Sequence, residues 1–514
     1  MVEQSIPPIL RPDSPNQVLL SELASELEIP FTPGTQDVKL TGVSMNTSDI
    51  RKGDIFFAMP GFKTHGAKFA SQAITGGAVA IATDTEGLTE LGAIEVPVIV
   101  VENPRLRLGE AARFVYGNSP DQMPLMYGVT GTNGKTSTVH FLSAIFRQIG
   151  AVPGMSSSVE RHIADDIIIS RLTSPEAPES HALIARMREH NVTDVGWEVS
   201  AQALRQHRVD GIFFDIVAFT NLSHDHFDEF ESYEQYLASK MPLFHKSRAG
   251  KGVVCLDTDY GQTFLKASEI PCVTITLREE VQSDWKVKVT EEGVGLTAFD
   301  LLGPNGEKIS TSVPIIGDYM ASNAGVAILM AIQAGHDWKK LAVDLKDGIK
   351  APIAGRGDNV APIGAPSVYV DFGHTPDSIE MTIKAARKVT SGKLVVVVGL
   401  DGDRDKIKRP MIGAICARLS DAMIVTDHNP RFEDPAIIRQ MIYDGAIAER
   451  PDHDIRNLEG PERAIRIAVS MVSTGDTIIW FGPGHQEHRD IMGVRTKYSG
   501  RAQAKAALAE AGWK

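Results

Sequence analysis

The sequence predicts an α/β protein of three domains, and three observations carry this prediction. The chain has 514 residues, more than one hydrophobic core normally organises. Apolar runs suited to buried strands alternate with amphipathic helical stretches along most of the chain. The composition, with 43% hydrophobic and 23% charged residues, is that of an ordinary globular protein and excludes collagen-like, disordered and coiled-coil architectures.

Two connections divide the chain. The stretch 114–126, FVYGNSPDQMPLM, is rich in Gly, Asn and Pro, and the stretch 351–357, APIAGRG, loses hydrophobic periodicity. We therefore expect an N-terminal domain over 1–123, a central domain over 124–351 and a C-terminal domain over 352–514.

The N-terminal domain is predicted to be a small α/β unit. GDIFFAM (53–59) and VAIAT (79–83) are typical of strands, and the stretch 66–78 between them is typical of a helix that ends at Gly.

The central domain is predicted to contain a doubly wound, mainly parallel sheet. A helix is expected at 137–150, an antiparallel hairpin at 285–302 and a further helix at 321–335. The expected parallel strands are 126–130, 193–200, 214–222 and 251–257.

The C-terminal domain is also predicted to contain a parallel sheet and to be Rossmann-like. Its continuous apolar strands are KLVVVVGL (393–400), DAMIVTD (421–427) and DTIIWFG (476–482). Amphipathic helices are expected between them at 435–446 and 461–472.

Charge and targeting signals restrict the function. The chain carries 52 Lys+Arg against 65 Asp+Glu, a net charge of -13, which argues against nucleic acid as a partner. The first residues lack a basic and then apolar leader, and no apolar run reaches about 18 residues. We expect a soluble, cytoplasmic protein with no membrane partner. Cys255, Cys272 and Cys416 suit a reducing compartment and are expected to be small core residues.

The strongest local signal is TGTNGKT at 130–136, between an expected strand and an expected helix. Such a loop brings backbone N–H groups to phosphate, while its Lys reaches the β and γ phosphates and its Thr hydroxyl holds Mg²⁺. Val129 stands where a strict Walker A loop has Gly. The predicted nucleotide contacts are Gly131, Thr132, Asn133, Gly134, Lys135, Thr136 and Ser137.

A nucleotide loop alone does not choose between a motor, a kinase, a GTPase and a ligase. The chain has no Asn/Thr-Lys-x-Asp motif to read guanine, which weakens the GTPase hypothesis. Further motifs follow in order through all three expected domains: Thr173-Ser174-Pro175, Glu198-Val199-Ser200, FTNLSHDHFD (219–228), YEQYLASKMPLF, Gly355-Arg356, VDFGHTPDSIE, GDRDKIKRP, DHNPR and GPGHQ.

This series of motifs resembles the Mur ligases, the UDP-N-acetylmuramoyl-peptide ligases of peptidoglycan synthesis. HTPDS, GDRDKIKRP and DHNPR look most like the member that adds the third amino acid to UDP-N-acetylmuramoyl-L-alanyl-D-glutamate. The resemblance implies that ATP phosphorylates the substrate's free carboxylate, and that the amine of a diamino acid then displaces phosphate from the acyl phosphate.

The resemblance also implies a magnesium site. Thr136, Glu198 and His226 match its ligands, and Lys240 matches a lysine that is carbamylated in this family and so becomes carboxylate-like. Read without the resemblance, Lys240 would be a solvated surface charge. The implied catalytic residues are Lys135, Lys240, Glu198 and His226.

Substrate and ATP contacts follow from the same motifs. Thr173, Ser174, Ser200 and Arg208 match residues that hold the muramoyl-dipeptide, and Ser44 lies in the segment expected to hold the uridine part. The expected ATP contacts from the helix at 321–335 and from the C-terminal domain are Asn323, Arg356, Asp371 and His374. Domain closure over ATP is implied.

The incoming amino acid is expected at the segment Asn429-Pro430-Arg431, with Arg404, Arg409 and Gln486 nearby. Arg431 could clamp the distal carboxylate of meso-diaminopimelate, whereas Gln486 stands where diaminopimelate-adding relatives carry Glu. L-lysine and ornithine therefore stay open, as does a role of Arg431 confined to capping the loop. Departures from the family pattern occur at Ser48, Ala201, Gln202, His224, Met320, Gly373, His428 and Gln486.

Two other functions are compatible with part of this pattern. A folylpolyglutamate-type amide ligase would share the loop but lack the uridine-binding domain and the Asn-Pro-Arg segment. A catalytically silent paralogue acting as a binding module would explain the departures. We expect a monomer that uses ATP and Mg²⁺ and binds small molecules.

Overall fold

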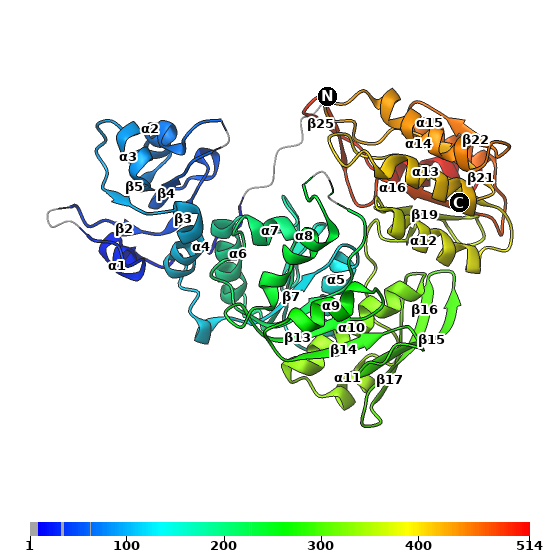
Figure 1. The fold of residues 1–514 in the computed structure, drawn as a ribbon, viewed down its shortest axis with the longest axis horizontal. Helices are drawn as coiled ribbons and strands as arrows, with labels where there is room; N and C mark the ends of the chain where they lie inside the picture. The colour runs from blue at the N-terminus through cyan, green and yellow to red at the C-terminus, as the bar shows by residue number, and fades with distance from the viewer. Residues whose placement is uncertain (1–8, 32–34, 62, 226, 228, 514) are drawn as a thin grey trace.

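The structure, a computed structural model, describes residues 9–31, 35–61, 63–225, 227 and 229–513, and consists of three α/β units in chain order (Figure 1). Each unit has its own parallel sheet and hydrophobic core. The α/β class with a largely parallel central sheet, predicted above, is confirmed.

The N-terminal unit carries a four-stranded parallel sheet of order β3-β4-β5-β6 and a short β1-β2 pair. Its strands are β1 (Val18–Leu19), β2 (Lys39–Leu40), β3 (Gly42–Ser44), β4 (Asp54–Ala58), β5 (Ala78–Thr83) and β6 (Val98–Val100). Its helices are α1 (Leu20–Glu26), α2 (Ala70–Thr75), α3 (Thr85–Glu90) and α4 (Pro104–Val115). The predicted helix over 66–78 is shorter, because its first turn is a 3-10 helix (Gly66–Phe69) in which the His65 ring accepts from the Ala67 N–H.

The central unit is an eleven-stranded sheet of order β10-β9-β8-β11-β7-β12-β13-β14-β15-β16-β17. Strands β8 to β15 in this order run parallel, and antiparallel hairpins extend both ends. The strands are β7 (Leu125–Thr130), β8 (Pro153–Ser156), β9 (Glu160–Ile163), β10 (Asp166–Ile169), β11 (Asp194–Glu198), β12 (Phe214–Phe219), β13 (Ala249–Cys255), β14 (Cys272–Thr276), β15 (Trp285–Gly293), β16 (Leu296–Leu302) and β17 (Lys308–Val313). The helices are α5 (Lys135–Gln148), α6 (Ala177–Glu189), α7 (Ala201–Arg205), α8 (Tyr233–Ala238), α9 (Tyr260–Ala267), α10 (Asp318–Ala334) and α11 (Trp338–Asp344).

Both faces of this sheet are buried, which explains the apolar runs of its parallel strands. Tyr127 and Val129 pack on one side with α5 and α10, while Met126 packs on the other with α6 and α7. The doubly wound arrangement therefore holds α5 at the carboxyl end of β7, where the phosphate-type loop lies.

The C-terminal unit is a six-stranded sheet of order β18-β19-β23-β20-β21-β22, parallel except for β18. Its strands are β18 (Asp358–Asn359), β19 (Ser367–Asp371), β20 (Leu394–Val398), β21 (Ala422–Val425), β22 (Ile455–Asn457) and β23 (Thr477–Phe481), with a separate hairpin β24 (His488–Ile491) and β25 (Val494–Lys497). Its helices are α12 (Pro376–Val389), α13 (Lys408–Leu419), α14 (Pro435–Glu449), α15 (Pro461–Ser470) and α16 (Gly500–Glu510).

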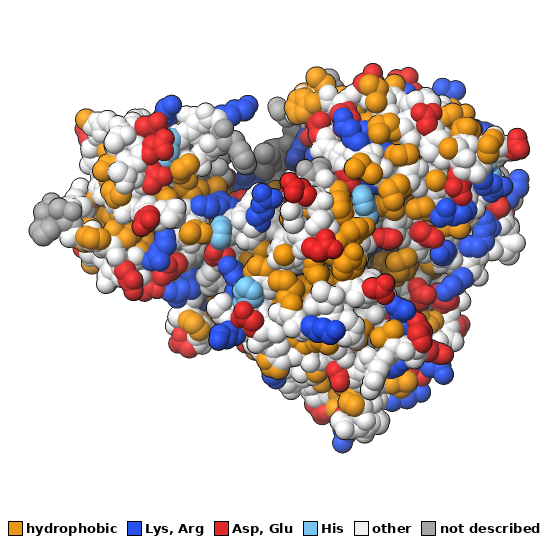
Figure 2. Space-filling model, viewed as in Figure 1, with side chains coloured by type: hydrophobic (Ala, Val, Ile, Leu, Met, Phe, Trp, Pro, Cys, Tyr) orange, Lys and Arg blue, Asp and Glu red, His pale blue; other side chains and the backbone are white. Residues whose placement is uncertain are grey.

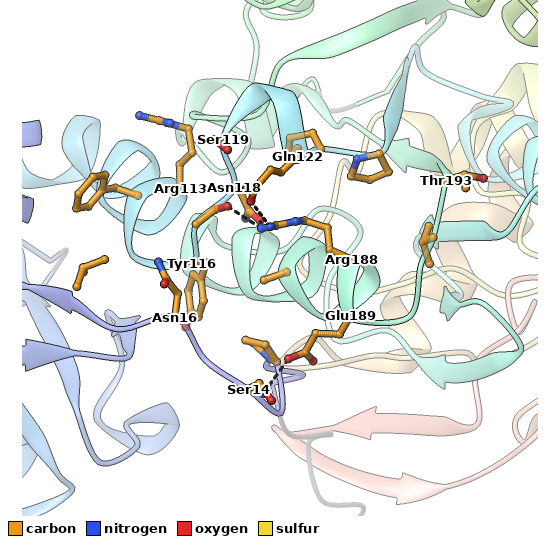
Figure 3. A pocket seen from close by; sticks show the side chains of 18 of the residues that line it. Ser14, Asn16, Arg113, Tyr116, Asn118, Ser119, Gln122, Arg188, Glu189 and Thr193 are labelled. Atoms are coloured by element: carbon orange, nitrogen blue, oxygen red, sulfur yellow. Dashed lines mark hydrogen bonds between the residues drawn. The ribbon is translucent and has the colours of Figure 1, made fainter.

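The linker from the N-terminal unit is fixed against α6 (Figure 3). Arg188 donates to Gly117 O at 2.7 Å and to Asn118 Oδ1 at 3.1 Å, and Glu189 accepts from the Ser14 N–H at 2.8 Å. These contacts line an open cleft that contains none of the predicted site residues.

The surface charge, the helices and the cysteines can each be compared with the expectations from sequence. Acidic and basic side chains are interspersed over the visible face, without an extended patch of one sign (Figure 2). Among the described helices, none is long and apolar enough to cross a membrane. Cys255 and Cys416 are buried, Cys272 is half-buried, and all three are free thiols.

Candidate active site

Most of the predicted site residues line one cleft of about 590 Å³ between the central and C-terminal units. Its walls include Thr132, Asn133, Gly134, Lys135, Thr136, Ser137, Thr173, Glu198, Ser200, Arg208, Asn323, Arg356, Asp371, His374, Arg404, Arg409, Arg431 and Gln486. Ser44 lies in a neighbouring cleft, and His226 lies outside the described residues. The tertiary structure thus brings together residues as far apart in sequence as Thr132 and Gln486.

The loop between β7 and α5 needs its glycines. Gly131 has φ 145° and Gly134 has φ 87°, conformations that side chains disfavour. A Cβ on Gly131 would lie 2.0 Å from Oγ1 of Thr220, and one on Gly134 would lie 2.4 Å from Oδ1 of Asn323. Both positions therefore require glycine, and Asn323 of α10 lies directly against the loop.

Lys135, the first residue of α5, is folded over this loop. Its Nζ donates to Gly131 O at 2.9 Å and to Thr132 O at 2.7 Å. Burial lowers the pKa of Lys135, against the opposing effect of Glu198 and Asp225. The ammonium group is held by carbonyl oxygens, and an incoming anion would stabilise its charge.

Glu198, at the end of β11, is fully buried and is fixed by a residue that sequence reasoning missed. Ser158 donates to Glu198 through its N–H at 2.9 Å and through its hydroxyl at 2.8 Å. The Ser158 hydroxyl also lies 3.1 Å from Oγ1 of Thr173. Ser174 donates to the Glu198 carbonyl oxygen at 2.9 Å and accepts from the Ser200 N–H at 3.2 Å, so it fixes the end of the strand.

Lys240 is not a surface charge, because its side chain is only 1% exposed. Its Nζ lies 3.3 Å from Gly131 O and 4.0 Å from the centre of the Tyr236 ring. Burial, reinforced by Lys135, places the pKa of Lys240 well below its ordinary value, although Asp225 opposes the shift.

Arg356 reaches the loop from the start of the C-terminal unit. Its guanidinium lies 4.5 Å from the centre of the Phe372 ring and donates to Oγ1 of Thr136 at 3.3 Å. Burial lowers the pKa of Arg356 and raises that of Asp371. Asp371 accepts from the N–H groups of Gly357 and Gly373, each at 2.6 Å, and so pins the inter-domain connection.

Three domains of one family match the chain in the order of this architecture. They are the Mur ligase family catalytic domain over residues 39–116, the Mur ligase middle domain over 129–331 and the Mur ligase glutamate ligase domain over 355–484. A UDP-N-acetylmuramyl-tripeptide synthetase of Leifsonia xyli is 43% identical over 99% of both chains. The chain belongs to the Mur ligase family.

Two further relatives agree with this membership. A UDP-N-acetylmuramoyl-L-alanyl-D-glutamate–2,6-diaminopimelate ligase of Streptomyces avermitilis is 38% identical over 97% of this chain and 98% of its own. A solved structure titled as a ligase of that same activity is 24% identical, covers 97% of this chain and 100% of its own, and has a TM-score of 0.67, which shows a shared fold.

In this Mur ligase the C-terminal unit contributes arginines that are paired with carboxylates. Arg431 donates to Asp401 at 2.8 Å, and His428 lies 3.3 Å from the same carboxylate. Asn429 donates to Oε1 of Gln486 at 2.8 Å. The departures His428 and Gln486 are thus packed into one polar cluster around the predicted amino-acid site.

Arg409 and Arg404 differ within this cluster. Arg409 is 1% exposed and makes two hydrogen bonds to Glu433, at 2.8 and 3.0 Å, so its charge is already neutralised. Arg404 lines the cleft, and no ion pair of Arg404 occurs within the described part of the chain. Of the two predicted substrate contacts, only Arg404 presents an uncommitted cation.

Polar contacts close the central unit of the ligase against its C-terminal unit. Lys408 donates to Asp225 at 3.0 Å, and His374 lies 3.6 Å from the same carboxylate. The departure His224 lies 3.0 Å from Asp405, so it bridges the two units. Asp225 and Lys408 lie within the motifs FTNLSHDHFD and GDRDKIKRP, but neither was assigned a role from sequence, because a motif does not show which charges meet across two units.

Other departures have different settings. Gln202 and Met320 line the main cleft, and the Gly373 N–H binds Asp371, whereas Ala201 is buried at the start of α7. Ser48 lies in the 3-10 helix Thr47–Asp49 of the N-terminal unit. None of these substitutions separates Lys135, Thr136 or Glu198 from the cleft.

Proposed function

We propose that this protein, an ATP-dependent Mur ligase, joins a diamino acid to UDP-N-acetylmuramoyl-L-alanyl-D-glutamate. One observation carries the proposal: the nucleotide loop, Thr173, Ser200 and Arg431 all line a single cleft. The names of the Leifsonia and Streptomyces relatives, which match nearly the whole chain, support the same activity.

The ATP phosphates fit the loop between β7 and α5. Its glycines allow the positive φ angles of the loop backbone, and the N-terminus of α5 favours negative charge. Lys135 and Arg356 would neutralise the phosphates, and Asn323 lies at the loop where the nucleotide base would follow. In this proposal Asp371 and His374 contact the ribose and adenine.

The donor chemistry beside the loop fits Mg²⁺, which prefers oxygen ligands. Thr136 offers a hydroxyl and Glu198 a buried carboxylate, and His226 is kept as a proposed third ligand. Among the described residues no cluster of three His, Cys, Asp or Glu side chains could hold a metal by itself, so phosphate and water oxygens would complete the shell. Mg²⁺ would supply charge neutralisation for phosphoryl transfer.

Lys240 is proposed to be carbamylated. Carbamate formation joins a neutral amine to CO2 with release of one proton, and the burial that lowers the pKa of Lys240 favours the neutral amine. The product would be an anion beside Lys135, which would convert an unfavourable pair of cations into an ion pair. Lys240→Ala should lose activity, and short exogenous carboxylates should restore part of it. Full activity of the variant would contradict this role.

The third amino acid is proposed to be meso-diaminopimelate. Its distal end carries an ammonium and a carboxylate, and the Arg431–Asp401 pair offers the complementary charges 2.8 Å apart. L-lysine or ornithine is the second candidate, because Gln486 is a neutral amide bound to Asn429 and leaves the site with less charge selectivity.

The decisive experiment measures ADP release with the nucleotide substrate and each of diaminopimelate, lysine and ornithine in turn. Amino-acid-dependent ADP release, largest with diaminopimelate, is the expected result. Release without any amino acid would indicate an uncoupled ATPase, and no release with any of them would indicate a silent paralogue. A folate substrate serves as the control for the folylpolyglutamate hypothesis, which the Asn429–Arg431 cluster disfavours.

The proposed chemistry also bears on the oligomeric state and the location of the protein. The substrates are small soluble molecules, so we propose a cytoplasmic monomer. Light scattering on the purified full chain tests the oligomeric state.

A further inference from the structure

The hairpin β24–β25 leaves the C-terminal unit on the side that faces the N-terminal unit (Figure 1). Its turn end is hydrogen-bonded to the segment that carries the proposed amino-acid contacts. The Arg431 N–H donates to Asp490 O at 3.1 Å, and the Met492 N–H donates to Arg431 O at 2.8 Å. The Asp490 N–H donates to Oδ1 of Asn429 at 3.1 Å. Three hydrogen bonds therefore hold the hairpin against that segment.

The hairpin also lines a second cleft, of about 300 Å³, to which all three units contribute. Its walls include Ser44, Met45 and Asn46 from the N-terminal unit, Arg171, Leu172 and Glu176 from the central unit, and His488 and Arg495 from the hairpin. Leu172 lines both this cleft and the main one, so the two adjoin. A substrate whose peptide end lies at Thr173 would continue into the second cleft.

Each carboxylate that lines this cleft is paired with an arginine. Asp49 lies 3.2 Å from Arg171, and Glu176 lies 2.6 Å from Arg105 and 2.9 Å from Arg208. The third carboxylate, Glu179, is paired with Arg161.

Arg495, the hairpin arginine that lines this cleft, has no such match. Arg495 is exposed, and within the described part of the chain no hydrogen bond or ion pair neutralises it. A neighbouring His488 adds no negative charge. The cleft thus holds an uncompensated arginine where all of its carboxylates are already paired.

We propose that Arg495 binds the diphosphate of the uridine nucleotide substrate, so that the C-terminal unit holds the nucleotide end of the substrate as well as the amino-acid end. The inference rests on the proposed function, because it takes the substrate to be a nucleoside diphosphate. A guanidinium suits this group, since its fork of N–H donors matches phosphate oxygens.

The test compares Arg495→Gln, Arg495→Lys and the control Lys497→Gln in the full-length enzyme. Lys497 is an exposed cation of the same strand that does not line the cleft. Arg495→Gln should raise KM for the nucleotide substrate about tenfold, because it removes a hydrogen bond between charged groups. KM for ATP and kcat should stay within about twofold. Arg495→Lys should recover part of the loss, and Lys497→Gln should resemble the unmodified protein.

A truncated substrate isolates the diphosphate. With N-acetylmuramoyl-L-alanyl-D-glutamate, which lacks the uridine diphosphate, the unmodified protein and Arg495→Gln should have equal kcat/KM. An unchanged nucleotide KM in Arg495→Gln, or an equal rise in Lys497→Gln, would overturn the inference. If the unmodified protein fails to turn over the nucleotide substrate, the proposed function itself is wrong, and the two failures are thereby distinguished.

Discussion

The two ends of the main cleft hold their cations in different ways. At the nucleotide end, Lys135, Lys240 and Arg356 are buried, and burial lowers the pKa of each. At the amino-acid end, Arg409 and Arg431 are paired with Glu433 and Asp401.

This difference separates two tasks. A buried cation without a direct carboxylate partner is costly in the empty cleft, and an arriving phosphate relieves that cost. An arginine that is already paired is fixed in orientation and contributes shape and hydrogen-bond geometry to selection. The nucleotide end is therefore built for charge neutralisation, and the amino-acid end for discrimination.

The largest expected effect follows from removing a nucleotide-end cation. Lys135→Met should reduce kcat for ADP release by about 10³, since a preorganised charge next to the transferred phosphoryl group is lost.

The same variant should keep or increase the free energy of unfolding at neutral pH. Because folding lowers the pKa of Lys135, the unfolded chain binds more protons, and stability in the unmodified protein should rise with pH up to about 10.5. Lys135→Met should lose that part of the rise. Thermal unfolding between pH 7 and alkaline pH measures it, and a marked loss of stability at pH 7 would contradict the unfavourable burial of this charge.

An intermediate effect is expected at the amino-acid end. Arg431→Lys should raise KM for diaminopimelate by about 10- to 100-fold, because the bidentate geometry is lost while the charge remains. KM for lysine should change less, and KM for ATP should stay constant. Asp401→Asn is the matched variant. It should also raise KM for diaminopimelate, because Arg431 loses the carboxylate that fixes its orientation. Equal losses for diaminopimelate and lysine would assign Arg431 to loop structure alone.

The smallest effect concerns the pair that supports this end. Glu433→Gln should lower the free energy of unfolding by about 1–3 kcal/mol, since it leaves the guanidinium of Arg409 buried without its counter-charge. The hydrogen bonds to Arg409 hold the pKa of Glu433 at about 2, so the contribution is fully present above the ordinary pKa near 4.5 and is lost as pH falls toward 2. The difference between the two proteins should therefore be constant from pH 7 to about 5 and shrink below that. Denaturant titration at each pH measures it, and a difference that grows on acidification would contradict the assignment.

Much of the fold was accessible from sequence, because its elements follow local patterns. The apolar runs at 393–400, 421–427 and 476–482 were predicted as buried strands and correspond to β20, β21 and β23. The hairpin over 285–302 was also confirmed as β15 and β16. The β24–β25 hairpin was missed, since HRDIMGVRTK does not alternate apolar and polar residues.

The candidate site likewise has residues that the sequence located and residues that only the structure identified. The phosphate-type loop carries a dense motif, with glycines whose positive φ the backbone requires, so it could be located from sequence. Ser158 and Asp401 belong to no quoted motif, and Asp225 lies in one without an assigned role. All three were found through their contacts with Glu198, Arg431 and Lys408.

By itself, the sequence determined the α/β class, several of the parallel strands, the nucleotide loop and the family resemblance, because each depends on neighbouring residues. Only the tertiary structure decided which charges are buried and which are paired. Burial of Lys240, neutralisation of Arg409 and the uncompensated charge of Arg495 all depend on segments that are distant in sequence. Electrostatic energy is set by distance and solvent exposure in space, and neither can be read from a side chain's position along the chain.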